Sequence, residues 1–206
     1  MKNTKLKTTL LTLAACFTSA TVFGQTVTLL TQTDNFADSG GNVTSGLYGI
    51  VVDTDGTGFA LGQYGPFDSA PGAGAWPDSF LTTGDGSATS DGLVYTNFYN
   101  DGFIGGAPSV RHSSGEGIAS TGDQFGIMWF PGLTEGDIPS VGDSYGFFTN
   151  DNLTIPSAGD TTPYGDFITD DIKTADYTVV PEPSTYAAIF GFGVLLFVFL
   201  RRRFKK

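Results

Sequence analysis

Cysteine and histidine are almost absent from this chain of 206 residues. The single cysteine is Cys16, in the N-terminal segment, and the single histidine is His112. An ordinary zinc site needs several Cys and His ligands, so this composition excludes one. It also excludes a disulfide within the chain, and the fold must therefore be held by its hydrophobic core alone.

Basic residues are scarce between residues 25 and 179, where only Arg111 and Lys173 carry a fixed positive charge. The whole chain has 21 acidic and 10 basic residues, for a formal net charge of −11, and most of the acids lie in this middle part. Such a surface repels polyanions, so we expect no nucleic acid partner and no binding to anionic lipid. Most of the acids are Asp, which favours turns and caps over helix interiors.

The sequence gives only weak signals of a serine hydrolase. A Ser-His-Asp triad would have to use His112, but its neighbours Ser113 and Ser114 are not placed on a nucleophile elbow. Gly142-Asp143-Ser144-Tyr145-Gly146 has the spacing Gly-x-Ser-x-Gly, but a predicted strand at 144–149 follows the turn, where a nucleophile elbow needs a helix. Gly142-Asp143-Ser144 resembles the opening block of one lipase-like family, in which the block comes early and a histidine follows. Here the block comes late and no histidine follows it.

A facing pair of carboxylates, which a glycosidase needs, cannot be singled out either. Glu116, Glu135 and many Asp are candidates, as they would be in any acidic protein. We therefore predict that the protein is not an enzyme, and we assign no catalytic residue. A secreted hydrolase is kept as the remote alternative.

Glycine and aromatic residues, in contrast, are abundant, with 29 Gly, 18 Phe, 8 Tyr and 2 Trp. A disordered linker would lack the aromatic residues. Short aromatic and β-branched runs separated by Gly-Asp turns predict a single all-β domain at residues 25–179, a β-sandwich or jelly roll. The best strand candidates are residues 26–31, 47–52, 93–99, 124–130, 144–149 and 177–180, and weaker candidates are 59–63, 79–82 and 167–169.

Two further patterns refine this prediction. The run Gly126–Phe130 is apolar on both of its faces, which indicates a central strand that is covered on both sides. Residues 68–78 are rich in Ala, Gly and Pro and predict a long surface loop. The Gly-Asp pairs recur at irregular spacing, so no internal repeat is predicted.

Aromatic side chains make a sugar-binding surface one open hypothesis. Trp76 and Trp129, together with Tyr64, Tyr95 and Tyr99, could form a platform on which sugar rings stack. Trp129 lies in an apolar run and is expected in the core, whereas Trp76 lies in the predicted loop and is expected on the surface. A carbohydrate-binding module is therefore the alternative function.

A structural calcium ion is a second open hypothesis. The segment Asp53–Gly58 starts like an acidic calcium loop but lacks the third Asp and the distal Glu of an EF-hand. Another group, Asp85, Asp91, Asn100 and Asp101, could meet in the loops of a sandwich. We expect no cofactor, leave this calcium ion as an alternative, and assign no metal ligand.

Residues 1–24 have the features of a secretory signal peptide. Three lysines precede an apolar run at residues 10–17, and small or permissive residues favour cleavage before Gln25. Cleavage after Ala20 is the second choice. Leu13–Cys16 also fits a lipoprotein box, in which Cys16 would be lipidated, and this alternative stays open.

The C-terminus has an uncharged apolar run at residues 186–200. As a helix it would be roughly 22 Å long, against a bilayer core of ~30 Å. It could still cross if the bilayer thinned and Arg201, Arg202 and Arg203 snorkelled to the headgroups. This basic tail would keep the end in the cytoplasm by the positive-inside rule.

Pro181-Glu182-Pro183-Ser184, followed by the apolar helix at 185–200 and the arginine cluster, resembles the PEP-CTERM sorting signal of Gram-negative bacteria. The resemblance is confined to residues 180–206. It implies export through the Sec machinery, insertion in the inner membrane through the C-terminal transmembrane helix, and cleavage near the motif by an exosortase. It also implies a final place at the cell surface or outside the cell, in association with exopolysaccharide and biofilm. The alternative is an ordinary tail anchor that is never cut.

Overall fold

The computed structural model describes residues 24–167, 171–181, 190–192 and 194–197. Several predictions therefore concern residues outside the described part of the chain: the signal peptide with Cys16, the motif residues Glu182, Pro183 and Ser184, and the arginine cluster Arg201–Arg203. The predicted apolar helix is described only at residues 190–192 and 194–197, which are helical. No helix within the described residues is long and apolar enough to cross a membrane.

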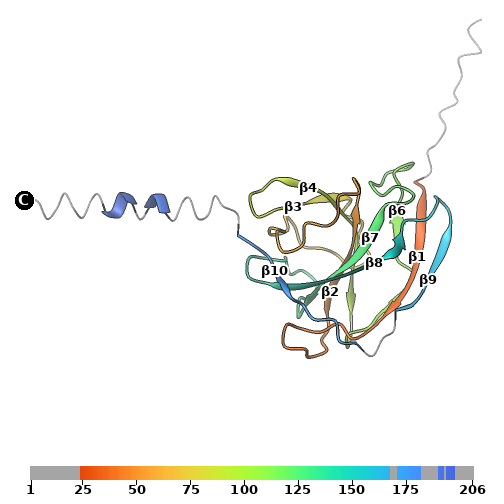
Figure 1. Cartoon of the computed structure of the whole chain (residues 1–206), viewed down its shortest axis with the longest axis horizontal. Coiled ribbons are helices and arrows are strands. Elements are labelled where there is room, and N and C mark those ends of the chain that lie inside the picture. The colour runs from red at the N-terminus through yellow and green to blue at the C-terminus, as the bar shows by residue number, and fades with distance from the viewer. Residues whose placement is uncertain (1–23, 168–170, 182–189, 193, 198–206) are drawn as a thin grey trace, which may run out of the picture.

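The domain consists of β-strands, and the all-β prediction is confirmed (Figure 1). In chain order the described strands are β1 (Thr26–Thr33), β2 (Gly46–Asp53), β3 (Ser79–Thr82), β4 (Ala88–Tyr99), β5 (Ile104–Gly106), β6 (Ser109–Arg111), β7 (Gln124–Pro131), β8 (Ser144–Thr154), β9 (Thr161–Phe167) and β10 (Tyr177–Thr178).

The strands form two sheets. The larger sheet has the order β10-β8-β7-β2-β4-β3, and all of its neighbours are antiparallel. The smaller sheet is built on β1, which pairs in parallel with β9 and antiparallel with both β5 and β6. The amide of Leu29 donates to the carbonyl of Pro108 at 2.9 Å, so the short strands β5 and β6 act as one interrupted partner of β1.

The larger sheet is buried on both faces. The first core brings together side chains of both sheets, among them Val27, Leu29, Ile50, Ile127 and Trp129. The second core covers the opposite face of the larger sheet and includes Leu47, Val51, Met128, Phe130, Tyr145 and Val179. Strand β7 alternates between the two cores, so the prediction of a central strand covered on both sides is confirmed.

The second core is closed by loop residues rather than by another sheet. Phe59, Leu61 and Phe67 pack against it from the connection between β2 and β3. The weak strand candidate at 59–63 is therefore wrong, since this segment turns at residues 61–62 and Gly62 has a φ of +75°. An extended strand does not accommodate that backbone conformation.

Four turns share one sequence pattern, Ser/Thr-x-Gly-Asp. In each, the Asp amide donates to the carbonyl of the Ser or Thr, and the glycine has a φ between +82° and +94°. In three of them the Asp carboxylate also accepts the Ser or Thr amide, at 2.7–2.8 Å. The turns lie at residues 120–123, 134–137, 140–143 and 157–160. Three of the four directly precede a strand, so this pattern marks where β7, β8 and β9 begin.

Candidate functional site

The first candidate site is the place where the chain leaves the domain. Strand β10 pairs with β8 at the edge of the larger sheet. The amide of Val179 then donates to the carbonyl of Asp143 at 2.9 Å, and the amide of Val180 donates to the carbonyl of Tyr64 at 3.0 Å. The side chain of Val179 is buried in the second core. The fold therefore holds the chain up to Val180.

A glycine makes room for the departing chain. Gly84 lies in the turn between β3 and β4 and is buried. A Cβ atom at this position would lie 2.6 Å from Cγ2 of Val180 and 2.9 Å from the carbonyl oxygen of Pro181. Because real Cβ atoms do not approach other atoms so closely, a larger residue would push the chain out of its place. Pro181, the first residue of the predicted motif, thus touches the domain.

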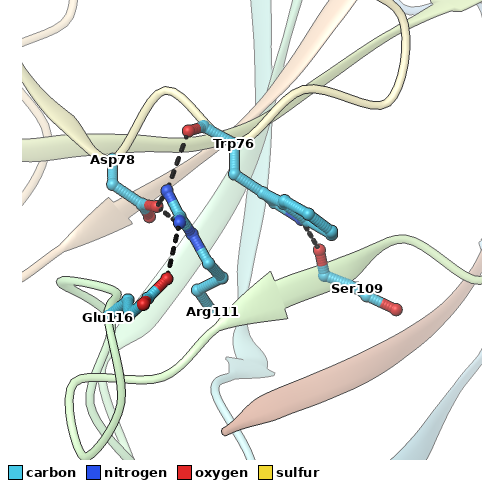
Figure 2. A network of polar contacts seen from close by, with 5 residues as sticks. All are labelled: Trp76, Asp78, Ser109, Arg111 and Glu116. Atoms are coloured by element: carbon cyan, nitrogen blue, oxygen red, sulfur yellow. Dashed lines mark hydrogen bonds and ion pairs between the residues drawn. The ribbon is translucent and has the colours of Figure 1, made fainter. Parts of the chain in front are cut away.

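The second candidate site surrounds Arg111, one of the two cations of the domain (Figure 2). Arg111 extends from β6 toward the 68–78 loop. Its Nε donates to Oδ2 of Asp78 at 2.5 Å, and its Nη2 binds both this carboxylate and the carbonyl of Trp76, the latter at 3.1 Å. Its Nη1 is 3.3 Å from the exposed carboxylate of Glu116. One arginine therefore ties the loop to the smaller sheet.

Asp78 holds an unusual position in this network. Its side chain is only 7% exposed, its Oδ1 has no hydrogen-bond partner among the described residues, and its backbone has a φ of +40°. Burial raises the pKa of the Asp78 carboxyl, and the hydrogen bond and charge of Arg111 act in the opposite direction. A positive φ is strained for a non-glycine residue, so the surroundings of Asp78 must hold its backbone in place. Arg111 is the partner that compensates the charge of its buried carboxylate.

Trp76 presents a fixed aromatic ring beside this ion pair. Its Nε1 donates to the carbonyl of Ser109 at 2.6 Å, and the guanidinium carbon of Arg111 lies 5.6 Å from the ring centroid (Figure 2). The side chain is nevertheless 45% exposed. Trp76 and Phe80, which is 46% exposed, line a groove of about 270 Å³ between the loop and strands β3 and β4.

Comparison with known proteins gives one match, at the first site. The model of the PEP-CTERM protein-sorting motif matches residues 179–203. The chain ends in a PEP-CTERM sorting motif. This finding confirms the resemblance drawn from the sequence, and it indicates an exported protein that an exosortase-type system processes at a membrane. No curated protein and no solved structure matches the chain.

The PEP-CTERM match begins where the fold ends. Residue 179 is buried in the second core, whereas Pro181 is the last residue before the undescribed part of the motif. The matched range includes the four predicted motif residues Pro181–Ser184 and the arginines Arg201–Arg203. The geometry at Gly84 and Tyr64 was not predicted, because nothing in the local sequence indicates which residues the departing chain contacts.

The predicted sugar-stacking platform is wrong in part. Trp76 is exposed and Trp129 is buried, as expected. Tyr64, Tyr95 and Tyr99, however, are all buried in the two cores and cannot join Trp76 on the surface. The exposed aromatic residue beside Trp76 in the groove is instead Phe80, which no pattern had singled out.

His112, the residue that any catalytic triad would have to use, is buried. It is only 7% exposed, with Nδ1 2.8 Å from the hydroxyl of Ser114 and Nε2 3.0 Å from the hydroxyl of Thr121. A catalytic triad has a carboxylate at the second ring nitrogen, where this histidine has Thr121. The ring links the end of β6 to the turn before β7.

The remaining acidic candidates are engaged in local structure. Gly142-Asp143-Ser144 belongs to the turn before β8, in which the Asp143 carboxylate accepts the amide of Ser140. Glu116 pairs with Arg111, and Glu135 lies in the connection between β7 and β8. In the described part of the chain, Glu116 and Glu135 therefore do not form the facing pair of carboxylates that a glycosidase needs.

The Asp53–Gly58 segment closes on itself. The buried carboxylate of Asp53 accepts the amide of Gly56 at 2.9 Å and that of Gly58 at 2.8 Å. Asp55 likewise accepts the amide of Thr57 at 2.9 Å. In the part of the chain that the structure describes, no group of three or more His, Cys, Asp or Glu is arranged to hold a metal ion.

The second acidic group does not converge. Asp91 lies near the start of β4, and Asn100 and Asp101 follow its end, about 30 Å away at ~3.3 Å per residue. Asp85 lies in the preceding turn and accepts the amide of Ser87 at 2.9 Å. The prediction that these residues meet is therefore wrong, because the long strand β4 separates them.

Proposed function

We propose that this protein is a non-enzymatic exported protein that an exosortase-type enzyme cuts next to its folded domain. The signal peptide would direct export through the Sec machinery, and the apolar C-terminal segment would hold the chain in the inner membrane until cleavage. The observation that carries the proposal is the match of residues 179–203 to the PEP-CTERM sorting motif. The hydrogen bonds of Val179 and Val180 support it, because the last of them is made by Val180, one residue before the motif begins.

Intact-mass analysis of the protein from its native host tests the proposal. Protein from membranes and from medium is compared between strains with and without the exosortase. Loss of the segment after the motif only when the enzyme is present is the expected result. An identical full-length C-terminus in both strains would show a plain tail anchor and refute the proposal.

A pair of matched substitutions sharpens this test. Glu182→Gln changes the motif, and Glu116→Gln removes an exposed carboxylate of the domain surface. We expect Glu182→Gln to lower the cleaved fraction and Glu116→Gln to leave it unchanged. Equal processing of both variants would show that the enzyme does not recognise the carboxylate of Glu182.

The geometry at Gly84 gives a second test. Gly84→Leu should displace Val180 and break its hydrogen bond to Tyr64, since even a Cβ atom at this position is too close. Hydrogen exchange at the Val180 amide is then expected to rise by about tenfold or more, while exchange in β7 stays slow. Unchanged exchange at Val180 would show that the exit is not as tight as the structure describes.

We also propose that the processed domain is deposited in an exopolysaccharide matrix at the cell surface. The acidic, cation-poor composition supports solubility outside the cell. Deletion of the gene for this chain should reduce the polysaccharide or the cohesion of the matrix, measured on biofilms grown side by side with the parent strain. An unchanged matrix would remove this part of the proposal without affecting the processing.

A further inference from the structure

The groove beside Trp76 combines exposed aromatic surface with an almost uncharged lining. Trp76 and Phe80 are both nearly half exposed, whereas most large aromatic side chains of the described domain lie in the two cores. Of the described residues that line the groove, Asp68 is the one that carries a charge, and none is a cation. An apolar surface of this kind on an acidic domain indicates a binding site rather than chance exposure.

Trp76 is fixed in one orientation before any ligand arrives. Its N–H is satisfied by Ser109 and the guanidinium of Arg111 lies against the ring, so the indole cannot rotate without losing both contacts. A ligand therefore meets a rigid aromatic surface, and the Trp76 side chain loses little conformational entropy on contact. The N–H is already used, so the ring offers its apolar surface, not a hydrogen bond.

The chemistry of the lining selects the occupant. Pyranose rings have an apolar C–H face that stacks on aromatic rings and hydroxyl groups that need polar partners at the edge. The exposed Asp68 carboxylate and the Ser79 hydroxyl line the same groove and can accept or donate such hydrogen bonds. An anionic ligand is disfavoured, because the lining offers it a carboxylate and no cation.

We propose that this groove binds a neutral polysaccharide, with a pyranose ring stacked on Trp76 and Phe80 at its side. The groove of about 270 Å³ is at the lower end of the size of ligand sites, which suits one or two sugar rings of a longer chain. The site deepens the proposed matrix function by naming the polymer class. Polysaccharide binding and C-terminal cleavage are measured by different experiments, so one proposal can fail without the other.

Retention on polysaccharides tests the site. The full-length chain, purified in a sugar-free detergent, is run in affinity gels that contain dextran, a soluble β-glucan, mannan, alginate or the matrix polysaccharide extracted from the host. We expect retardation by at least one neutral polymer and none by alginate, which is anionic. No retardation by any neutral polymer, or retardation by alginate alone, overturns the proposal.

Three variants assign the binding to the groove. Trp76→Ala and Phe80→Ala should each weaken retardation by about tenfold or more, as truncation of a central aromatic contact does. The Phe80 side chain has no part in the hydrogen bonds of Arg111. Weaker binding by Phe80→Ala therefore reports the loss of stacking, whereas Trp76→Ala could also loosen the loop. Phe103→Ala, an equally exposed ring in the turn between β4 and β5, is the control and should bind normally. Equal binding by all three variants would place any polysaccharide site elsewhere, and Trp76-dependent binding of a peptide alone would make the occupant a protein.

Discussion

Removal of the Arg111 charge should destabilise the domain in a way that depends on pH. Arg111→Met leaves the Asp78 carboxylate 93% buried without a counter-ion, and it also removes the hydrogen bond to the Trp76 carbonyl. Loss of one partner of a buried ion pair typically costs ~3–5 kcal/mol. Arg111 is 26% exposed, so water can partly replace it, and we expect about 2–3 kcal/mol at pH 7. For a domain of this size that corresponds to a fall in Tm of roughly 5–10 °C.

The pH dependence follows from the pKa of Asp78. Burial already raises this pKa above its ordinary value, and loss of Arg111, which lowers it, raises it further in the variant. The native variant then binds a proton more tightly than the unfolded chain, so its stability falls as pH rises from about 4, the unfolded pKa, through the folded pKa. The deficit relative to the parent protein should therefore be largest at pH 7 and should shrink toward pH 4, where Asp78 becomes neutral.

Urea unfolding of the full-length chain, followed by circular dichroism at pH 7 and at pH 4, measures this deficit. Asp78→Asn provides the control, because it removes the charge that Arg111 compensates. Arg111→Met should cost clearly less in the Asp78→Asn background than in the parent protein. The same cost in both backgrounds, or a deficit that does not change with pH, would refute the argument from the buried carboxylate.

Two more substitutions probe the cores. Tyr64→Phe removes the 2.7 Å hydrogen bond to the buried Asp91 carboxylate and should cost about 1.5–3 kcal/mol at pH 7 in urea unfolding. The deficit should shrink toward pH 4, because burial raises the pKa of Asp91 and loss of the tyrosine hydroxyl raises it further; a pH-independent cost would contradict this. Gly146→Ala would place a methyl group on the Trp129 ring and should cost about 1–3 kcal/mol, whereas Gly72→Ala, with its nearest neighbour at 3.4 Å, should cost little. Equal costs for the two alanine variants would show that the contact at Trp129 is not tight.

The sequence predicted the strands in which apolar and aromatic side chains form a local run, among them β3, a weak candidate whose bounds were right although the strand is mostly exposed. The run Gly126–Phe130 predicts a central strand because both of its faces are apolar, and β7 does lie between the two cores. Strands β5, β6 and β9 were missed, apart from the last residue of β9. The first two have three residues each, and β9 contains a proline and a glycine. Their strand conformation comes from pairing with β1, a long-range contact that leaves no local pattern.

The sequence also marks several turns that directly precede strands. The pattern Ser/Thr-x-Gly-Asp occurs five times at irregular spacing, and four of these occurrences form the turn described above. The fifth, at residues 82–85, lies between β3 and β4, and its glycine does not take a positive φ. In the other four, each position has a physical reason: the glycine takes a positive φ, and in three of the four turns the Asp carboxylate accepts the first amide. Used as a turn signal, the pattern at residues 157–160 would have predicted that a strand, β9, begins directly after it.

Side-chain sites were harder to predict than strands, because partners far apart in sequence decide them. Trp76 could be placed on the surface from its Pro- and Gly-rich surroundings, but its contact with Arg111 joins residues 35 positions apart. The buried positions of Tyr95 and Tyr99 depend on the first core, and that of Tyr64 depends on the second. The polar ends of these tyrosines made a surface position plausible, yet the structure buries them.

The sorting motif and the fold constrain each other. The chain is held by backbone hydrogen bonds up to Val180, so an enzyme that binds an extended substrate can reach it only from Pro181 onward unless β10 opens. Five residues lead from Pro181 to the start of the apolar run at Tyr186, a length of at most about 17 Å. On the proposed function, the enzyme therefore cuts within about 17 Å of the point where the hydrogen bonds of the fold end. The acidic surface of the domain then favours its departure from anionic headgroups once the chain is cut.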